Sequence, residues 1–107
     1  GDERDATLKR VFCQSTARRQ LLFVALAKWG DESIDKYIIG SMAASRDLTD
    51  EEHDGLRKAM ASIYARDAAR NESARGIWRS SVDDWYELLK SDFQRTHSDD
   101  QPIDCQK

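Results

Sequence analysis

An unbroken run of apolar residues from Leu21 to Ala27 constrains the fold of this chain more than any other feature. In a helix such a run presents apolar side chains in every direction, and only surrounding elements can then bury them. The run is far shorter than the roughly 20 apolar residues that span a bilayer, so we expect no membrane insertion. The segment therefore predicts the centre of a helical bundle.

The composition of the 107-residue chain favours helices over strands. Only one proline and five glycines are available for tight turns, whereas good helix formers such as Ala, Leu, Arg, Lys and Glu are abundant. A chain of 107 residues is long enough for one modest core but not two. We therefore expect one all-α domain over residues 1–107, a compact bundle of four main helices.

The first helix is predicted from about Ala6 to Trp29. Asp5 is its expected N-cap, and Gly30 stands at the position where a left-handed residue often ends a helix. The polar sequence at residues 14–16, Gln-Ser-Thr, can mark a kink or a new helix start. The sequence is compatible with either one kinked helix or two shorter helices.

A second, short helix is predicted after Gly30, with Asp31 or Ser33 as its cap. Its apolar residues recur at spacings of three and four, which places them on one helix face. These residues are Ile34, Tyr37, Ile38 and Met42.

The third helix has the clearest start in the sequence. Thr49 and Glu52 fit a capping box, in which each side chain accepts a hydrogen bond from the backbone N–H of the other residue. The helix is expected to end near Asn71. Its apolar stripe is Leu56, Met60, Ile63 and Tyr64.

The fourth helix, capped by Asn71 or Ser73, carries the strongest helical periodicity. Its predicted core stripe is Trp78, Val82, Trp85, Leu89 and Phe93. Residues 97–107 are polar, and we expect an irregular tail there unless Cys105 anchors it.

Net charge and motifs argue against several function classes. The formal charge of −3 lacks the positive field that nucleic acid requires. Cys13, His53, His97 and Cys105 are scattered singly, which predicts no metal site. A dyad of Cys13 with His53 or His97 is the remaining catalytic alternative, but Cys13 lies on an apolar helix face, where a small core residue is more typical. We expect no enzyme and no cofactor.

The two cysteines stand near opposite ends of the chain. A bridge between Cys13 and Cys105 would close most of the chain into a loop and contribute on the order of 4 kcal/mol in the chain-entropy model. Two free thiols in a cytosolic protein would have the same sequence. Both readings stay open.

Three sets of charged or aromatic residues could form functional surfaces. Adjacent carboxylates such as Asp83 and Asp84 point about 100° apart on a helix, which favours a solvated face over a joint chemical role. Arg19 falls close to an apolar stripe, so we expect it to pair with a carboxylate of another helix. Tyr86 shares a helix face with charged residues that include Arg79, and an aromatic among charges is typical of an interface.

The arrangement of segments resembles the small helical immunity proteins that bacteria export to the periplasm against type VI secretion amidase effectors. The resembling features are Cys13 in the first helix, the sequence Lys-Tyr-Ile-Ile-Gly at residues 36–40, the helix start at residues 48–52, and a final amphipathic helix followed by a second cysteine.

The resemblance implies a noncatalytic, periplasmic or secreted protein that occludes the active site of a cysteine amidase. By position, it implies contacts from the connector Ser45, Arg46 and Asp47, with Arg79 and Tyr86 as a second patch. The alternatives are a cytoplasmic helical adaptor that acts through a dimer or partner interface, and a periplasmic carrier with an apolar cavity. A homodimer is compatible with either location.

Overall fold

The computed structural model describes residues 2–30, 36–70, 82–95 and 102–105, and over these residues it forms an all-α bundle without strands. The helices are α1 (Asp2–Phe12), α2 (Thr16–Trp29), α3 (Lys36–Ala43), α4 (Asp50–Arg70) and α6 (Val82–Arg95). The radius of gyration is 13.2 Å, close to the value of about 13 Å expected for a compact domain of this length. The expectation of a compact helical bundle is confirmed.

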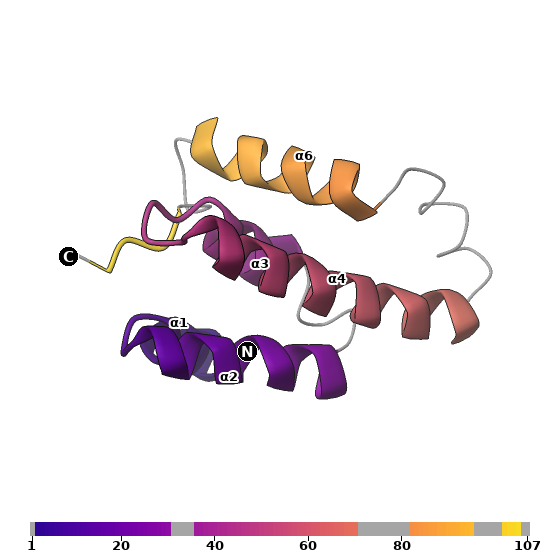
Figure 1. The fold of residues 1–107 in the computed structure, drawn as a ribbon, viewed down its shortest axis with the longest axis horizontal. Coiled ribbons are helices and arrows are strands. Elements are labelled where there is room, and N and C mark those ends of the chain that lie inside the picture. Colours follow the sequence, from indigo (N-terminus) through magenta and orange to yellow (C-terminus); the bar gives the residue numbers. More distant parts are fainter. Residues whose placement is uncertain (1, 31–35, 71–81, 96–101, 106–107) are drawn as a thin grey trace.

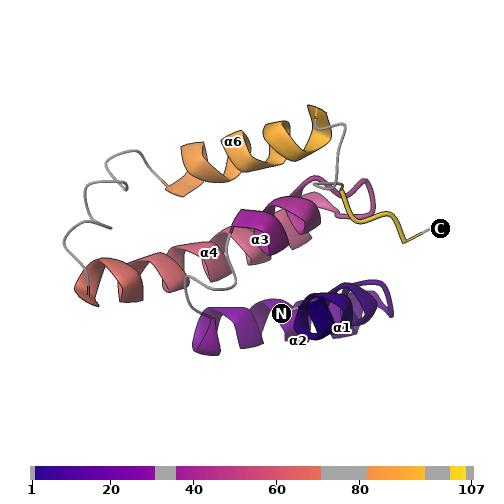
Figure 2. The same cartoon turned by 180° about the vertical axis from the view of Figure 1, so that it is seen from behind.

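The helices lie in three layers, with α1 and α2 on one side, α3 and α4 in the middle, and α6 on the other side (Figures 1 and 2). Helix α4 packs against α2, α3 and α6. It therefore occupies the central position that the sequence suggested for the Leu21–Ala27 segment, which instead belongs to an outer layer. The prediction of the central helix was wrong, because α2 packs on the core along one side only.

The first predicted helix is two helices, which settles the alternative left open by the sequence. Ser15 is the N-cap of α2, and its Oγ accepts a hydrogen bond from the Arg18 N–H at 3.1 Å. Helix α1 begins at Asp2, before the predicted cap at Asp5. The turn between the helices lets α1 fold back beside α2 (Figure 2).

Gly30 ends α2 in an extended conformation, with φ of −66° and ψ of 154°, and not in the predicted left-handed one. Glycine is required there by close packing, since a Cβ atom would collide with the Leu26 carbonyl and the Ile63 side chain. The guanidinium of Arg66 on α4 donates hydrogen bonds to the carbonyl oxygens of Ala27 and Gly30. A cation from α4 thus completes the C-terminus of α2.

The capping box at the start of α4 is confirmed. The Thr49 N–H donates to Glu52 Oε1 at 3.0 Å, and the Glu52 N–H donates to Thr49 Oγ1 at 3.2 Å. The helix is described from Asp50 to Arg70, and the predicted end near Asn71 lies outside the described residues.

The core lies between the three layers and includes the predicted α4 stripe. Its large apolar members are Phe12, Leu22, Phe23, Leu26, Ile38, Ile39, Met42, Leu56, Met60, Ile63, Tyr64, Tyr86, Leu89 and Ile103. Among the predicted residues, Ile34 and Trp78 lie outside the described part of the chain, as do the proposed caps at residues 31, 33, 71 and 73.

Residues 102–105 are irregular, as predicted, yet they belong to the core. Ile103 is buried, and its N–H donates to the Ser41 carbonyl of α3 at 2.9 Å. Cys105 forms a disulfide with Cys13, with the two Cα atoms 5.3 Å apart. Cys105 therefore anchors this segment. We had expected an irregular tail unless Cys105 did so.

Candidate protein-binding surface

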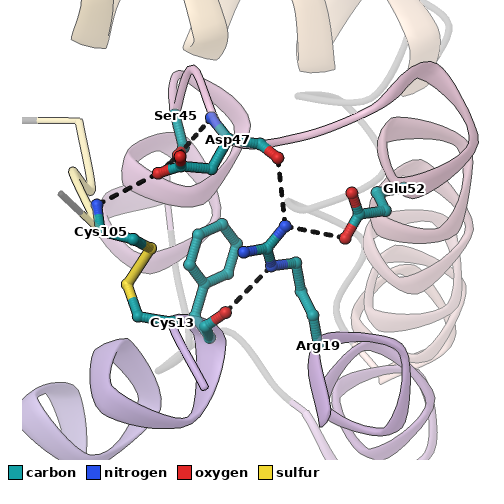
Figure 3. Close-up of a disulfide and its surroundings, with 7 residues drawn as sticks. Cys13, Arg19, Ser45, Asp47, Glu52 and Cys105 are labelled. Atoms are coloured by element: carbon teal, nitrogen blue, oxygen red, sulfur yellow. Dashed lines mark hydrogen bonds and ion pairs between the residues drawn. A yellow bond between two sulfur atoms is a disulfide. The ribbon is translucent and has the colours of Figure 1, made fainter. Parts of the chain in front are cut away.

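The predicted contact loop, Ser45 to Asp47, is mostly used to hold the fold together. Ser45 is buried, its hydroxyl accepts the Asp47 N–H at 3.2 Å, and it donates to Asp47 Oδ2 at 3.3 Å. The same Asp47 oxygen accepts the Cys105 N–H at 3.1 Å (Figure 3). Of the three residues, only Arg46 is exposed. The local sequence Ser-x-Asp explains the turn, because short polar side chains bond neighbouring backbone groups.

Arg19 forms the buried ion pair with another helix that its position predicted. Its guanidinium lies 2.9 Å from Glu52 Oε2 of α4 and also donates to the carbonyl oxygens of Phe12, at 2.9 Å, and Asp47, at 3.2 Å. Figure 3 shows these bonds converging beside the disulfide. One cation thereby joins the α1–α2 turn, the loop before α4, and α4 itself.

Glu52 remains ionised within this cluster. Its burial alone would raise the carboxyl pKa, but hydrogen bonds from Thr49 and Arg19 outweigh that cost, and the pKa is lowered from its ordinary value of 4.5. Both of its oxygens have donors. The pair therefore has a structural role, and the carboxylate is not presented to a substrate.

The disulfide removes the catalytic alternative that involves Cys13. A cysteine nucleophile acts as a thiolate, and the sulfur of Cys13 is bonded to Cys105. Of the two histidines considered as its partner, His53 bonds a tyrosine instead, and His97 lies outside the described residues.

Tyr86 is a core residue and not the exposed interface aromatic that we predicted. It is fully buried, and its hydroxyl lies 2.6 Å from Nδ1 of His53 on α4. The buried stripe of α6 runs through Tyr86, Leu89 and Phe93, while Trp85 flanks it in a partly buried position. The predicted stripe is confirmed for Leu89 and Phe93, whereas Tyr86, about 100° from Trp85 around the helix, takes the fully buried position that we had assigned to Trp85.

Charged residues cover the edge of this tyrosine and histidine pair. Arg57 lies over the Tyr86 ring at 4.8 Å and forms a 2.8 Å ion pair with Glu87. Burial lowers the pKa of His53, and the positive charges of Lys90 and Arg57 lower it further. Burial also raises the pKa of Tyr86. The neutral histidine with the tyrosine hydroxyl is therefore the stable form of the contact between α4 and α6.

The predicted second patch of Arg79 and Tyr86 therefore loses Tyr86, which is buried. Arg79 lies outside the described residues, so its position relative to Tyr86 is not part of the structure. Asp83 and Asp84 are both exposed, as a solvated face requires.

The exposed apolar surface of the described chain is instead concentrated on α2. Leu21 is 62% exposed, Val24 64% and Trp29 71%. Arg18 and Lys28 are exposed as well, and the Lys28 ammonium lies 4.9 Å from the Trp29 ring centre. We call Arg18, Leu21, Val24 and Lys28 the α2 outer face; Trp29 points about 100° away from Lys28 around the helix and is not part of it.

The geometry of a helix explains why these side chains share a surface. Leu21, Val24 and Lys28 follow one another at spacings of three and four, and Arg18 precedes Leu21 by three. The opposite side of α2 buries Leu22, Phe23 and Leu26. We did not predict this surface from the sequence, because we expected neighbouring helices to cover the apolar run on all sides. The apolar run itself was the signal that could have indicated it.

Exposed apolar residues that share one helix face can contact another macromolecule, whereas singly scattered ones are common on protein surfaces. Among the described residues, no group of histidine, cysteine or acidic side chains could hold a metal ion. No helix in the described part of the chain is long and apolar enough to cross a membrane.

Comparison with known proteins yields no relative of this chain: no family model, no curated protein and no solved structure matches it.

Proposed function

We propose that this chain is a noncatalytic protein-binding domain, and that the α2 outer face is its contact surface. The observation that carries the proposal is the exposure of Leu21 and Val24 on one side of a helix whose other side is packed in the core. Leaving such side chains in water forgoes the stabilisation that burial provides. A partner that covers them would recover it on binding.

The rest of the molecule supports a binding role by holding this helix firmly. Arg19 and Arg66 tie the two ends of α2 to other parts of the fold, and the disulfide lies beside the turn that precedes it. A preorganised surface loses less conformational entropy when a partner binds. Helix α2 therefore offers a rigid contact face.

The disulfide favours a periplasmic or secreted location. Such bonds persist in oxidising compartments and are rare in the cytosol. A comparison of the mass of the natively expressed protein before and after reduction, with free thiols blocked, tests this. A gain of two blocking groups only after reduction supports export, whereas blocking of both cysteines without reduction contradicts it.

The specific function that we propose is inhibition of a secreted peptidoglycan amidase, as in immunity proteins of type VI secretion. This part rests on the resemblance of the helix order and cysteine positions to such proteins. The α2 outer face replaces Ser45, Asp47 and Tyr86 as the proposed contact, since those side chains are engaged within the fold. Arg46 is exposed and stays a candidate.

The test is an inhibition titration against a secreted peptidoglycan amidase, chosen from the genes that neighbour the one for this chain. Wild-type chain should block peptidoglycan hydrolysis at a one-to-one ratio, and the Leu21→Asp/Val24→Asp variant should need about hundredfold more protein. Leu88→Asp is the matched control, because Leu88 is a 48% exposed leucine on α6, away from the proposed face. Absence of inhibition by the wild type would contradict the immunity role. Full inhibition by the double variant would contradict the contact surface.

A further inference from the structure

The charge on α2 indicates what kind of partner fits its outer face. The helix contains no acidic residue between Thr16 and Trp29, whereas the whole chain has a formal charge of −3. Exposed Arg18 and Lys28 stand near opposite ends of the apolar surface formed by Leu21 and Val24. The α2 outer face is therefore apolar in its middle and positive toward both ends.

A second copy of this chain is a poor match for such a surface. If two copies paired their α2 helices in antiparallel fashion about Leu21 and Val24, Arg18 of one helix would lie close to Lys28 of the other. A parallel pairing would place each cation beside its own counterpart. Either symmetric arrangement brings like charges together, and α2 supplies no carboxylate to compensate them.

An anionic lipid surface is also disfavoured. Helices that bind membranes electrostatically carry many basic residues along a broad polar face, because each contributes only modestly. The α2 outer face provides two cations, and the negative net charge of the chain opposes approach to an anionic bilayer. A narrow protein segment can contact this face without meeting the acidic remainder of the molecule.

We propose that the partner presents an amphipathic helix to the α2 outer face, with an apolar stripe between two carboxylates. Arg18 and Lys28 are ten residues apart, which is about 15 Å along a helix. The two carboxylates should therefore lie about 15 Å apart on the partner helix, which corresponds to a spacing of ten residues. This inference rests on the proposed function, whose contact surface it shares, and adds the chemistry of the partner.

The test uses two synthetic helical peptides with the same apolar stripe. One carries glutamates and the other lysines at two positions ten residues apart, and each is titrated into the intact, oxidised protein by calorimetry. The glutamate peptide should bind about tenfold more tightly, and added salt should reduce that preference. In the Arg18→Glu/Lys28→Glu variant the preference should reverse. Both side chains are exposed, and circular dichroism checks that this variant folds.

Equal affinity for the two peptides, or no binding of either up to about 1 mM, would overturn the inference. So would a dimer in sedimentation that Leu21→Asp/Val24→Asp abolishes, because a second copy would then occupy the face. Binding to vesicles of phosphatidylcholine and phosphatidylglycerol that requires Arg18 and Lys28 would assign the face to lipid. If the amidase titration responds to Leu21→Asp/Val24→Asp while the peptides are not distinguished, the contact surface stands and only the acidic partner helix fails.

Discussion

Replacing Arg19 by methionine should be among the most damaging single changes to this protein. Arg19 is 7% exposed, and its guanidinium donates to the Glu52 carboxylate and to the carbonyl oxygens of Phe12 and Asp47. Its removal leaves a buried negative charge without its counter-ion, which typically costs about 3–5 kcal/mol. Domains of this size are stable by roughly 5–15 kcal/mol, so the variant should be close to unfolding.

The double variant Arg19→Met/Glu52→Met distinguishes the cost of an unpaired buried charge from the cost of lost hydrogen bonds. It removes both charges together and leaves the Phe12 and Asp47 carbonyls and the Thr49 N–H without partners, at about 1 kcal/mol each. The double variant should therefore be no less stable than Arg19→Met. The matched control is Arg57→Met, which breaks a partly exposed ion pair and should cost about 1 kcal/mol.

Urea denaturation of the oxidised proteins measures these free energies of unfolding. For Arg19→Met the deficit should shrink as the pH falls, because protonation of Glu52 then removes its unpaired charge. In the wild type the opposite holds: the pKa of Glu52 is lowered from 4.5, so its contribution is complete above that pH and is lost below it. The reasoning is refuted if the single-variant costs of Arg19→Met and Glu52→Met simply add, within about 0.5 kcal/mol, in the double variant.

Three further predictions concern stability. Cys13→Ser/Cys105→Ser should lower the free energy of unfolding by about 4–5 kcal/mol, because the bridge spans 92 residues; a loss under about 1 kcal/mol in urea would contradict the chain-entropy account. The pKa of His53 is lowered in the folded state, so stability should fall as the pH drops below about 6.5, and His53→Gln should flatten that dependence; an unchanged slope would assign the effect to other groups. Gly40→Ala should lower the thermal midpoint despite the better helix propensity of alanine, because its Cβ would collide with the Phe93 ring and overpacking costs about 1–3 kcal/mol; a raised midpoint would contradict this.

Local signals in the sequence predicted local structure well. The capping box of Thr49 and Glu52 marked the start of α4, and the stripe from Leu56 to Tyr64 identified its buried side. The polar residues 14–16 indicated a possible kink or new helix start, and Ser15 among them is the N-cap of α2. Each of these inferences depends on residues only a few positions apart.

Features that depend on the tertiary arrangement were not predictable in the same way. Periodicity could not decide whether Trp85 or Tyr86 faces the core, because both recur with Leu89 and Phe93 at helical spacings. The choice is made by His53 on α4, which offers a hydrogen-bond partner to the tyrosine hydroxyl. An apolar run likewise does not reveal how many neighbours cover it.

The contact surface, too, could not be predicted from local sequence where it depends on tertiary contacts. The Ser45 to Asp47 connector was predicted as a contact by its position between helices, since connectors often carry function. Local sequence does not reveal that Asp47 accepts the backbone N–H of Cys105, a residue 58 positions away. Leu21 and Val24 were assigned to the core although they are exposed. Whether an apolar residue is buried depends on tertiary neighbours that its local sequence does not reveal.

The most direct test of the α2 outer face is methyl NMR of the isotope-labelled chain with the amidase that we propose as its partner. Leu21, Val24 and Leu88 are all exposed in the free protein, so their methyl groups start from similar surroundings. On addition of the partner, the Leu21 and Val24 methyl resonances should shift and gain cross-saturation from it, while those of Leu88 should not. Cross-saturation of Leu88 with unchanged Leu21 and Val24 signals would contradict the account.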